Sequence, residues 1–250
     1  MFQRFKQRSY KPERIDIGDY TFEEYERCIV ELQLVNRWLG DARVLRDTLL
    51  RDVTAQNLAD FSVLDVGAGS GELLRVASNW AHQNKRRLRG VGLELNERSA
   101  QAIMEESNSS INAVRGNALA LPFADAQFDY VICSLFTHHF VDKEVVDIFR
   151  EMSRVARRRI FVIDLHRHPI AYLLYTTVGK LFLHTSLLRE DGALSILRSF
   201  TADELSALGR GAGLQQISVT RHFPFRLVLS AVADGATAYS APRIRTNKAA

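Results

Sequence analysis

The sequence has little cysteine and little proline, and each shortage excludes a class of protein. Cys28 and Cys133 are the only cysteines among 250 residues, and they are too far apart to form a Cys-x-x-Cys pair. A disulfide framework and a cysteine zinc site are therefore not expected, and a reducing cytoplasm is the expected compartment. The 5 prolines and 14 glycines are too few for a low-complexity or collagen-like chain.

The sequence also lacks a long uncharged apolar run. Its first residues, MFQRFKQRSYKPER, are charged and aromatic and have no apolar core of a signal peptide. The longest apolar stretch, Pro169 to Leu188, is interrupted by Gly179, Lys180 and His184. Because a membrane span needs ~20 nearly uncharged residues, we expect no transmembrane segment.

Charge of either sign is present in similar amounts. The 33 Lys and Arg residues against 29 Asp and Glu residues give a net charge of +4. The basic residues are scattered, so the charge does not predict a nucleic-acid partner. What remains, 46% hydrophobic and 25% charged residues, is typical of a globular chain with one substantial core.

The chain reads as one domain with additions at both ends. Residues 1–20 are expected to form a basic arm that is mobile over residues 1–14, and residues 21–51 carry apolar side chains at helical spacing. Residues 235–250 are small and basic, which predicts a disordered tail. We find no repeat and no linker that divides residues 21–234.

Apolar strand-like runs alternate with helix-like stretches in the centre of the chain. This alternation predicts an α/β fold with a mostly parallel sheet that helices cover on both faces. Two closely spaced runs around Pro224 predict an antiparallel pair at the sheet edge. The strand-like runs are 62–66, 90–95, 128–134, 159–165, 216–222 and 225–232, and the helix-like stretches are 71–84, 97–107 and 143–155.

A glycine-rich turn joins the first strand to the first helix of this series. The segment VLDVGAGSGELL places Asp65 near the strand end and glycines at 67, 69 and 71. Such a turn lets a ligand approach the backbone closely, with helix N–H groups directed at it. Dinucleotide enzymes need G-x-G-x-x-G, and the last position is Glu72 here. An acid two residues before the first glycine suits a ligand with an ammonium and a sulfonium group.

The Asp-x-Gly-x-Gly-x-Gly pattern resembles motif I of class I S-adenosylmethionine (SAM) dependent methyltransferases. A strand that ends at Glu94, the run GNALALPF at 116–123 and the run FDYVICS at 128–134 resemble the following stretches of the same family. The resemblance implies a Rossmann-like, doubly wound, mostly parallel seven-stranded sheet with an antiparallel edge hairpin. It also implies N-terminal helices, an apolar helical insertion after strand five, SAM as the cofactor and S-adenosylhomocysteine as the product.

The resemblance gives individual residues expected roles. Glu94 stands where the ribose hydroxyls are held, and Ser134 stands beside the methionine end of the cofactor. Asn117 replaces the common Asp, and its amide oxygen can accept the same hydrogen bond from the adenine amino group. The expected cofactor-binding residues are Asp65, Gly67, Ala68, Gly69, Gly71, Glu94, Leu95, Asn117, Ala118 and Ser134.

Four of the seven histidines follow strands four and five, where ligands of open α/β sheets bind. They are His138 and His139 after one strand and His166 and His168 after the other. An oxygen or carbon acceptor must lose a proton to a base of near-neutral pKa. We expect His139 or His166 to be that base, with one imidazole oriented by Asp164. These side chains also offer metal ligands, but the family enzymes that need a metal carry different motifs, so no metal is expected.

Two segments can cover this site. Residues 21–51 would form a helical lid, in which Arg37 either meets the methionine carboxylate or stays solvated. Residues 169–190 form an apolar helical insertion that includes Tyr172 and Phe182. The insertion can be the wall of an acceptor pocket, a dimer face or a contact with a membrane surface. The oligomeric state stays open.

The favoured function is SAM-dependent methylation of a small hydrophobic or aromatic metabolite, polyketide- or quinone-like, in secondary metabolism. O-methylation of a phenol or enol comes first, and C- or N-methylation is the alternative. Enzymes that methylate amino groups of nucleic acids carry an Asn/Asp-Pro-Pro-aromatic motif where this chain has SLFT at 134–137, which disfavours RNA as the acceptor. A catalytically inactive SAM-binding scaffold is the remaining alternative, because the glycine loop reports cofactor binding rather than turnover.

Overall fold

The computed structural model describes residues 2–38, 40–105 and 110–235. One sheet has the strand order β3-β2-β1-β4-β5-β7-β6. Its strands are β1 (Asp60–Val66), β2 (Arg87–Glu94), β3 (Ile111–Arg115), β4 (Phe128–Ser134), β5 (Ala156–Leu165), β6 (Gln215–His222) and β7 (Arg226–Val232).

The sheet is mostly parallel and ends in an antiparallel pair. β1 pairs with β2 and β4, and β2 with β3 and β4 with β5, all in parallel register. β7 runs antiparallel to both β5 and β6. The expected doubly wound sheet with an edge hairpin is therefore confirmed. The chain order reverses between β1 and β4, and the crevice outside the carboxyl ends of strands at such a point is where ligands of this architecture bind.

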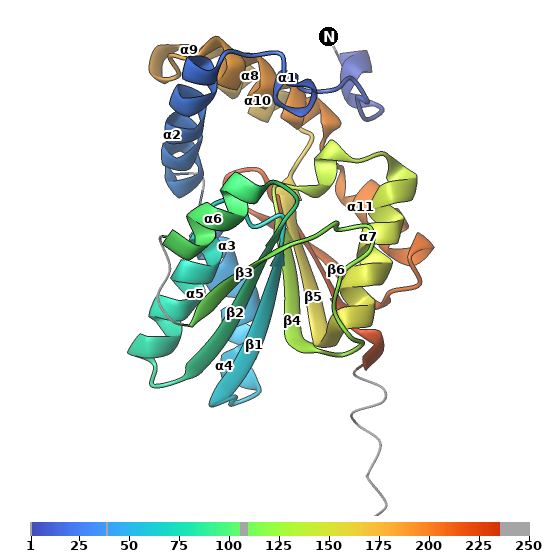
Figure 1. The fold of residues 1–250 in the computed structure, drawn as a ribbon. Coiled ribbons are helices and arrows are strands. Elements are labelled where there is room, and N and C mark those ends of the chain that lie inside the picture. The colour runs from blue at the N-terminus through green and yellow to red at the C-terminus, as the bar shows by residue number, and fades with distance from the viewer. Residues whose placement is uncertain (1, 39, 106–109, 236–250) are drawn as a thin grey trace, which may run out of the picture.

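Helices cover both faces of the sheet (Figure 1). One face of the sheet is covered by α3 (Asp41–Leu45), a π-helical segment (Arg46–Leu50), α4 (Arg51–Ala55), α5 (Glu72–Gln83) and α6 (Glu97–Glu105). The opposite face is covered by α7 (Asp142–Val155) and α11 (Ala202–Gly211).

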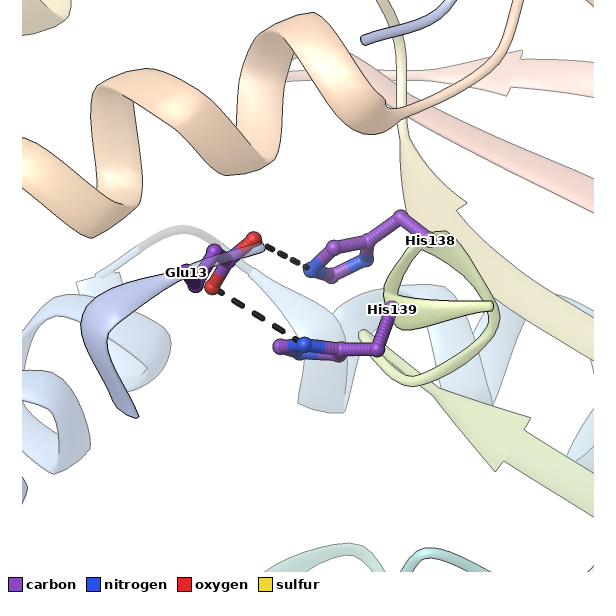
Figure 2. Close-up of side chains that lie close together, drawn as sticks. All are labelled: Glu13, His138 and His139. Carbon is purple, nitrogen blue, oxygen red and sulfur yellow. Dashed lines mark ion pairs between the residues drawn. The ribbon is translucent and has the colours of Figure 1, made fainter. Parts of the chain in front are cut away.

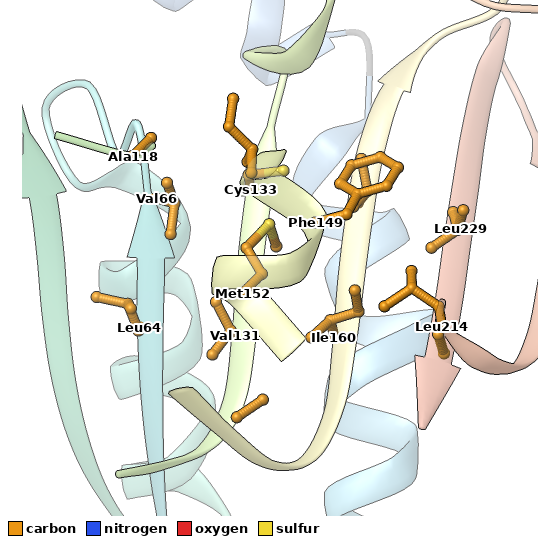
Figure 3. Packing of buried hydrophobic residues seen from close by; sticks show 14 of the residues in the cluster. Leu64, Val66, Ala118, Val131, Cys133, Phe149, Met152, Ile160, Leu214 and Leu229 are labelled. Atoms are coloured by element: carbon orange, nitrogen blue, oxygen red, sulfur yellow. The ribbon is translucent and has the colours of Figure 1, made fainter. Parts of the chain in front are cut away.

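The core between the sheet and α7 shows why this helix forms where it does (Figure 3). Val145, Ile148, Phe149, Met152 and Val155 recur at three- and four-residue spacing and are all fully buried. This spacing puts them on one face of a helix, which lies against Val131 and Cys133 of β4. The face is continuous with the side chains of β5 and β7.

Residues 41–55 lie in the core rather than in the lid expected over residues 21–51. Their apolar side chains pack with Phe61 of β1 and with α5. Of the helices within the expected lid, α2 (Phe22–Trp38) is the one that lies above the carboxyl ends of the strands (Figure 1). The fully buried residues of the 41–55 segment are Val44, Leu45, Leu49, Leu50 and Val53.

The N-terminal arm is packed, so the expectation that it is mobile is wrong. Arg8 is only 7% exposed, and its Nε donates to the carbonyl of Arg198 at 2.7 Å. Its guanidinium also pairs with Asp142. The short helix α1 (Arg14–Ile17) follows, preceded by the buried Glu13. The expected disordered tail lies, beyond residue 235, outside the described residues.

Four helices form a cap over the carboxyl ends of the strands (Figure 1). They are α2 and, from the insertion, α8 (Pro169–Thr177), α9 (Gly179–Phe182) and α10 (Ser186–Arg198). Leu187 and Leu188 pack against Cys28 of α2. Glu31 of α2 also accepts hydrogen bonds from the backbone at the start of α10. Within the described ranges, none of the helices has the length and apolar character needed to cross a membrane.

Candidate active site

A cavity of about 1320 Å³ lies between the carboxyl ends of the strands and the cap. It is lined by the glycine loop, by the turns after β4 and β5, and by apolar side chains of the cap. The expected site residues that line it are Asp65, Gly67, Ala68, Gly69, Ser134, His139 and His166. The expected residues that lie outside its lining are Gly71, Glu94, Leu95, Asn117 and Ala118.

The glycine loop has a backbone that other residues rarely adopt. Gly67, Gly69 and Gly71 all have positive φ, at 71°, 57° and 79°. A Cβ on Gly67 would lie 2.3 Å from the ring of Phe136, whereas a Cβ on Gly69 would meet open space. The loop therefore needs glycine for its conformation, and it leaves room beside Gly69 for a ligand to approach.

Two buried polar atoms at the carboxyl ends of β1 and β4 have no hydrogen-bond partner among the described residues. They are Oδ1 of Asp65 and Oγ of Ser134, and both residues line the cavity. Burial raises the pKa of Asp65 to about 8, and the nearby Glu94 carboxylate adds to the effect. A buried polar atom without a partner is costly. A ligand with an ammonium or sulfonium group would supply the missing charge, so these residues fit the methionine part of SAM.

Glu94 and Asn117 lie outside the cavity lining, and each accepts a hydrogen bond from a backbone N–H. The backbone N–H of Gly69 donates to Oε1 of Glu94 at 2.5 Å, so this carboxylate lies against the glycine loop. Burial raises its pKa. Oδ1 of Asn117 accepts from the N–H of Leu119 at 2.9 Å. The atom expected to face an adenine amino group is thus engaged in a local turn.

The Asp164 carboxylate orients a buried imidazole, and that imidazole belongs to His138. Nδ1 of His138 donates to Oδ1 of Asp164 at 2.6 Å, and Oγ1 of Thr137 donates to the other oxygen at 2.7 Å. Burial alone would raise the pKa of Asp164, but His138 and Thr137 lower it to about 2. The sequence favoured His139 and His166, neither of which is bonded to Asp164 in the described hydrogen bonds.

A carboxylate from the N-terminal arm lies between the two adjacent histidines (Figure 2). Oε1 of Glu13 is 4.0 Å from Nε2 of His138, and Oε2 is 3.9 Å from Nδ1 of His139. Oδ1 of Asp16 lies 3.0 Å from the same Nδ1. Glu13 is 2% exposed, and this burial raises its pKa to about 7.

Glu13 and Asp16 were not among the site residues expected from the sequence. A local signal exists, since their three-residue spacing places both carboxylates on one side of a helical turn. That signal does not show where the turn folds. The arm is held against the site by contacts to α10, including the hydrogen bond from Oγ of Ser195 to Oε1 of Glu13 at 2.9 Å.

The two histidines after β5 have different surroundings. His166 lines the cavity and is half-buried. Burial lowers its pKa, and the neighbouring His168 and Arg221 act in the same direction. A lowered pKa favours the neutral imidazole, which is the form that can accept a proton. Nδ1 of His168 instead accepts the N–H of Ile170 at 3.2 Å and caps α8.

The insertion walls the apolar half of the cavity. Leu174 of α8, Phe182 of α9 and Val178 between these helices line it, as do Ile29 and Leu32 of α2. Part of the same surface is open to solvent, with Phe182 69% exposed. The side chain of Arg37, which was expected to reach the cofactor, is outside the described part of the structure.

The strand order, the reversed β7 and the glycine loop after β1 define a Rossmann-like α/β domain with a cofactor site at the β1/β4 switch point. Residues 64–163 match the family model described as "Methyltransferase domain". Over these residues the chain resembles a methyltransferase domain, and the predicted resemblance to class I SAM-dependent methyltransferases is confirmed.

Three proteins illustrate what this chain is similar to. "Uncharacterized methyltransferase YcgJ" of Bacillus subtilis (strain 168) is 30% identical over 159 residues, which are 61% of this chain and 60% of that protein. "Demethylmenaquinone methyltransferase" of Bacillus licheniformis is 28% identical over 181 residues, 66% of this chain and 73% of that protein. The crystal structure of human N-acetylserotonin methyltransferase in complex with SAM has a TM-score of 0.59 at 16% identity, covering 91% of this chain and 63% of that one. At this identity the structure shows the fold alone. The matched region spans about 60% of the length of YcgJ.

Proposed function

We propose that the protein transfers the methyl group of SAM to a small apolar or aromatic metabolite, with the oxygen of a phenol or enol as the favoured acceptor atom. One observation carries the proposal. The unpartnered oxygens of Asp65 and Ser134 share a single continuous cavity with the pocket histidines and with the apolar wall of the cap.

The size of the cavity supports two ligands in contact. Pockets for one small molecule usually have ~300–1,000 Å³, and this one has about 1320 Å³. Methyl transfer needs the acceptor atom, the methyl carbon and the sulfur in line, so a site that holds both molecules supplies most of the catalysis. SAM, when bound, provides an electrophilic methyl group. Asp65 would hold its cationic end and Glu94 its ribose hydroxyls.

The pocket histidines supply the remaining chemistry. An imidazole nitrogen would accept the proton of the acceptor O–H, and the oxygen would bond to the methyl carbon as the carbon–sulfur bond breaks with its electron pair left on sulfur. His139 and His166 both line the cavity, and they are the candidate bases. The apolar side chains of α2 and α8 would exclude water and favour an apolar or aromatic acceptor over a nucleic acid.

Cofactor binding is the first test. Calorimetry should show binding of SAM and S-adenosylhomocysteine to the wild type, and Glu94→Ala should weaken it by about 1–3 kcal/mol, the scale of a lost hydrogen bond to a charged group. Glu97→Ala is the matched control, because it removes a nearby exposed carboxylate on α6 that pairs with Arg115 rather than with the glycine loop. A wild-type protein that binds neither compound would overturn the proposal.

Acceptor screening is the second test. Phenols, enols and amines of increasing apolar size are incubated with SAM, and mass spectrometry identifies the methylated atom. An O-methylated aromatic product supports the proposal. A C- or N-methylated product would show that carbon or nitrogen, and not oxygen, is the acceptor atom. Binding of SAM without transfer to any acceptor favours a scaffold. His139→Gln or His166→Gln should lower kcat by ~10²–10⁴-fold if that residue is the base, whereas His184→Ala, at an exposed histidine outside the cavity lining, serves as control.

A further inference from the structure

We infer that Glu13, Asp16, His138 and His139 form a binding site for one divalent transition-metal ion, with Zn²⁺ as the first candidate. The ligand atoms of Glu13, His138 and His139 all lie within 4.8 Å of one another (Figure 2). Asp16 adds a fourth oxygen, 3.0 Å from Nδ1 of His139. Imidazole nitrogens combined with carboxylate oxygens are a common zinc ligand set.

The spacing of these atoms is close to that of a metal site. Four ligands at ~2.0–2.1 Å from a tetrahedral ion lie ~3.4 Å apart. The separations here are 4.0 Å between Glu13 and His138, 3.9 Å between Glu13 and His139, and 3.0 Å between His139 and Asp16. These values bracket the tetrahedral spacing, so small side-chain rotations suffice to close the set around an ion.

The partner of His138 is a second and independent sign of a metal ligand. A histidine that binds a metal through one ring nitrogen commonly donates the N–H of the other to a carboxylate, which fixes its orientation. Nδ1 of His138 donates to Asp164, and Asp164 is itself held by Thr137 and by the backbone N–H of Leu165. Nε2 is thereby directed at Glu13.

The local charge also favours a divalent cation. Three carboxylates, Glu13, Asp16 and Asp164, contact the two imidazoles. The guanidinium of Arg198 approaches Glu13 at 3.5 Å and Asp16 at 3.8 Å. The other nearby cation, Arg8, is paired with Asp142. When the three carboxylates are ionised, they and Arg198 together carry a net charge of −2, which one Zn²⁺ ion would balance.

The site is closed on one side and open to the cavity on the other. The side chains of Glu13 and His138 are 3% and 4% exposed, and those of Asp16 and His139 are 30% and 26% exposed. Because four protein ligands fill a tetrahedral ion, a substrate atom would join it as a fifth ligand, an expansion that catalytic zinc sites allow. Metal binding stands independently, but a catalytic role rests on the proposed methyl transfer. An ion here would stabilise the acceptor oxyanion, and with His139 as a ligand it would leave His166 as the base.

Titration of the full-length protein with metal tests the inference. The chain is treated with a chelator, dialysed, and titrated with ZnCl₂ against a chromophoric chelator, and Co²⁺ is used to record the visible spectrum of the site. We expect one equivalent of tightly bound Zn²⁺. His139→Gln and Glu13→Gln should weaken binding at least tenfold, and Asp164→Asn should weaken it ~10–100-fold. His184→Ala, with a side chain 82% exposed outside the set, should bind as the wild type does.

Each outcome separates the metal site from the proposed function. No Zn²⁺ bound by the wild type, or equal affinity in all variants, overturns the metal site. Thermal unfolding of the metal-free variants reports whether they fold, and the partly exposed His139→Gln carries the test if Glu13→Gln does not. SAM binding is measured on the metal-free and the zinc-loaded protein. SAM binding without zinc binding leaves the proposed function intact, and zinc binding without SAM binding leaves only the metal site.

Discussion

Replacing Asp65 with Asn removes a buried carboxyl group and keeps its size. Burial, with a contribution from Glu94, raises the pKa of Asp65 to about 8, against an ordinary value of 3.8. Between these two pH values the folded protein holds the proton and the unfolded chain has lost it. The folded state therefore binds more protons, and the free energy of unfolding falls as pH rises through this window.

The size of the effect follows from the width of the window. Each pH unit inside it lowers the free energy of unfolding of the wild type by at most ~1.4 kcal/mol. Between about pH 5.5 and pH 7.5 the wild type should thus lose up to ~3 kcal/mol relative to Asp65→Asn, which has no group to titrate there. The ligand-free variant is expected to be the more stable protein at pH 8.

Urea denaturation of both proteins at several pH values measures this difference directly. Free energies of unfolding that change in parallel for the wild type and Asp65→Asn would refute the raised pKa. SAM binding gives a second readout, because a cation beside Asp65 favours its ionised form. Binding to the wild type near pH 7 should release a proton, which calorimetry in buffers of different ionisation enthalpy detects. Asp65→Asn should lose this release and lose more affinity for SAM than for S-adenosylhomocysteine.

Three further substitutions probe the loop, the core and the cap. Asp41→Ala removes the carboxylate that accepts from Nε of Arg226 at 2.6 Å, and Arg226 is only 2% exposed. We expect the free energy of unfolding, measured by urea denaturation, to fall by ~3–5 kcal/mol. An unchanged midpoint would contradict this. Gly67→Ala places a Cβ 2.3 Å from the ring of Phe136, at a residue with positive φ. The affinity for SAM, measured by calorimetry, should therefore fall at least tenfold. An affinity equal to that of the wild type would show that the loop can adapt. Leu187→Ala empties part of the fully buried contact between α10 and α2, which should cost ~2–5 kcal/mol and speed limited proteolysis within the cap. Proteolysis at the wild-type rate would show that this contact does not hold the cap.

The sheet and the glycine loop were predicted well because their signals are local. The runs expected at 62–66 and 128–134 correspond to β1 and β4, which are buried along almost their whole length and are therefore mostly apolar. The strand β3 was missed because its sequence INAVR is short and only its first residue is buried. Residues 41–55 were placed in the lid because helical periodicity shows that a face is apolar but not what it packs against.

The sequence by itself determined the fold class, the cofactor loop and the presence of four histidines at the carboxyl ends of two strands. Each of these depends on residue types and spacings within short segments of chain. Only the tertiary structure decided that the arm folds back, so that Asp16 meets His139, 123 positions further along the chain, and that Asp164 binds His138 rather than its neighbour. The physical reason is that the arm is held by partners from distant parts of the chain. Arg8 donates to the carbonyl of Arg198, Arg198 donates to the carbonyl of His138, and Ser195 donates to Glu13. These groups come within reach of one another only when α10 and the turn after β4 pack together.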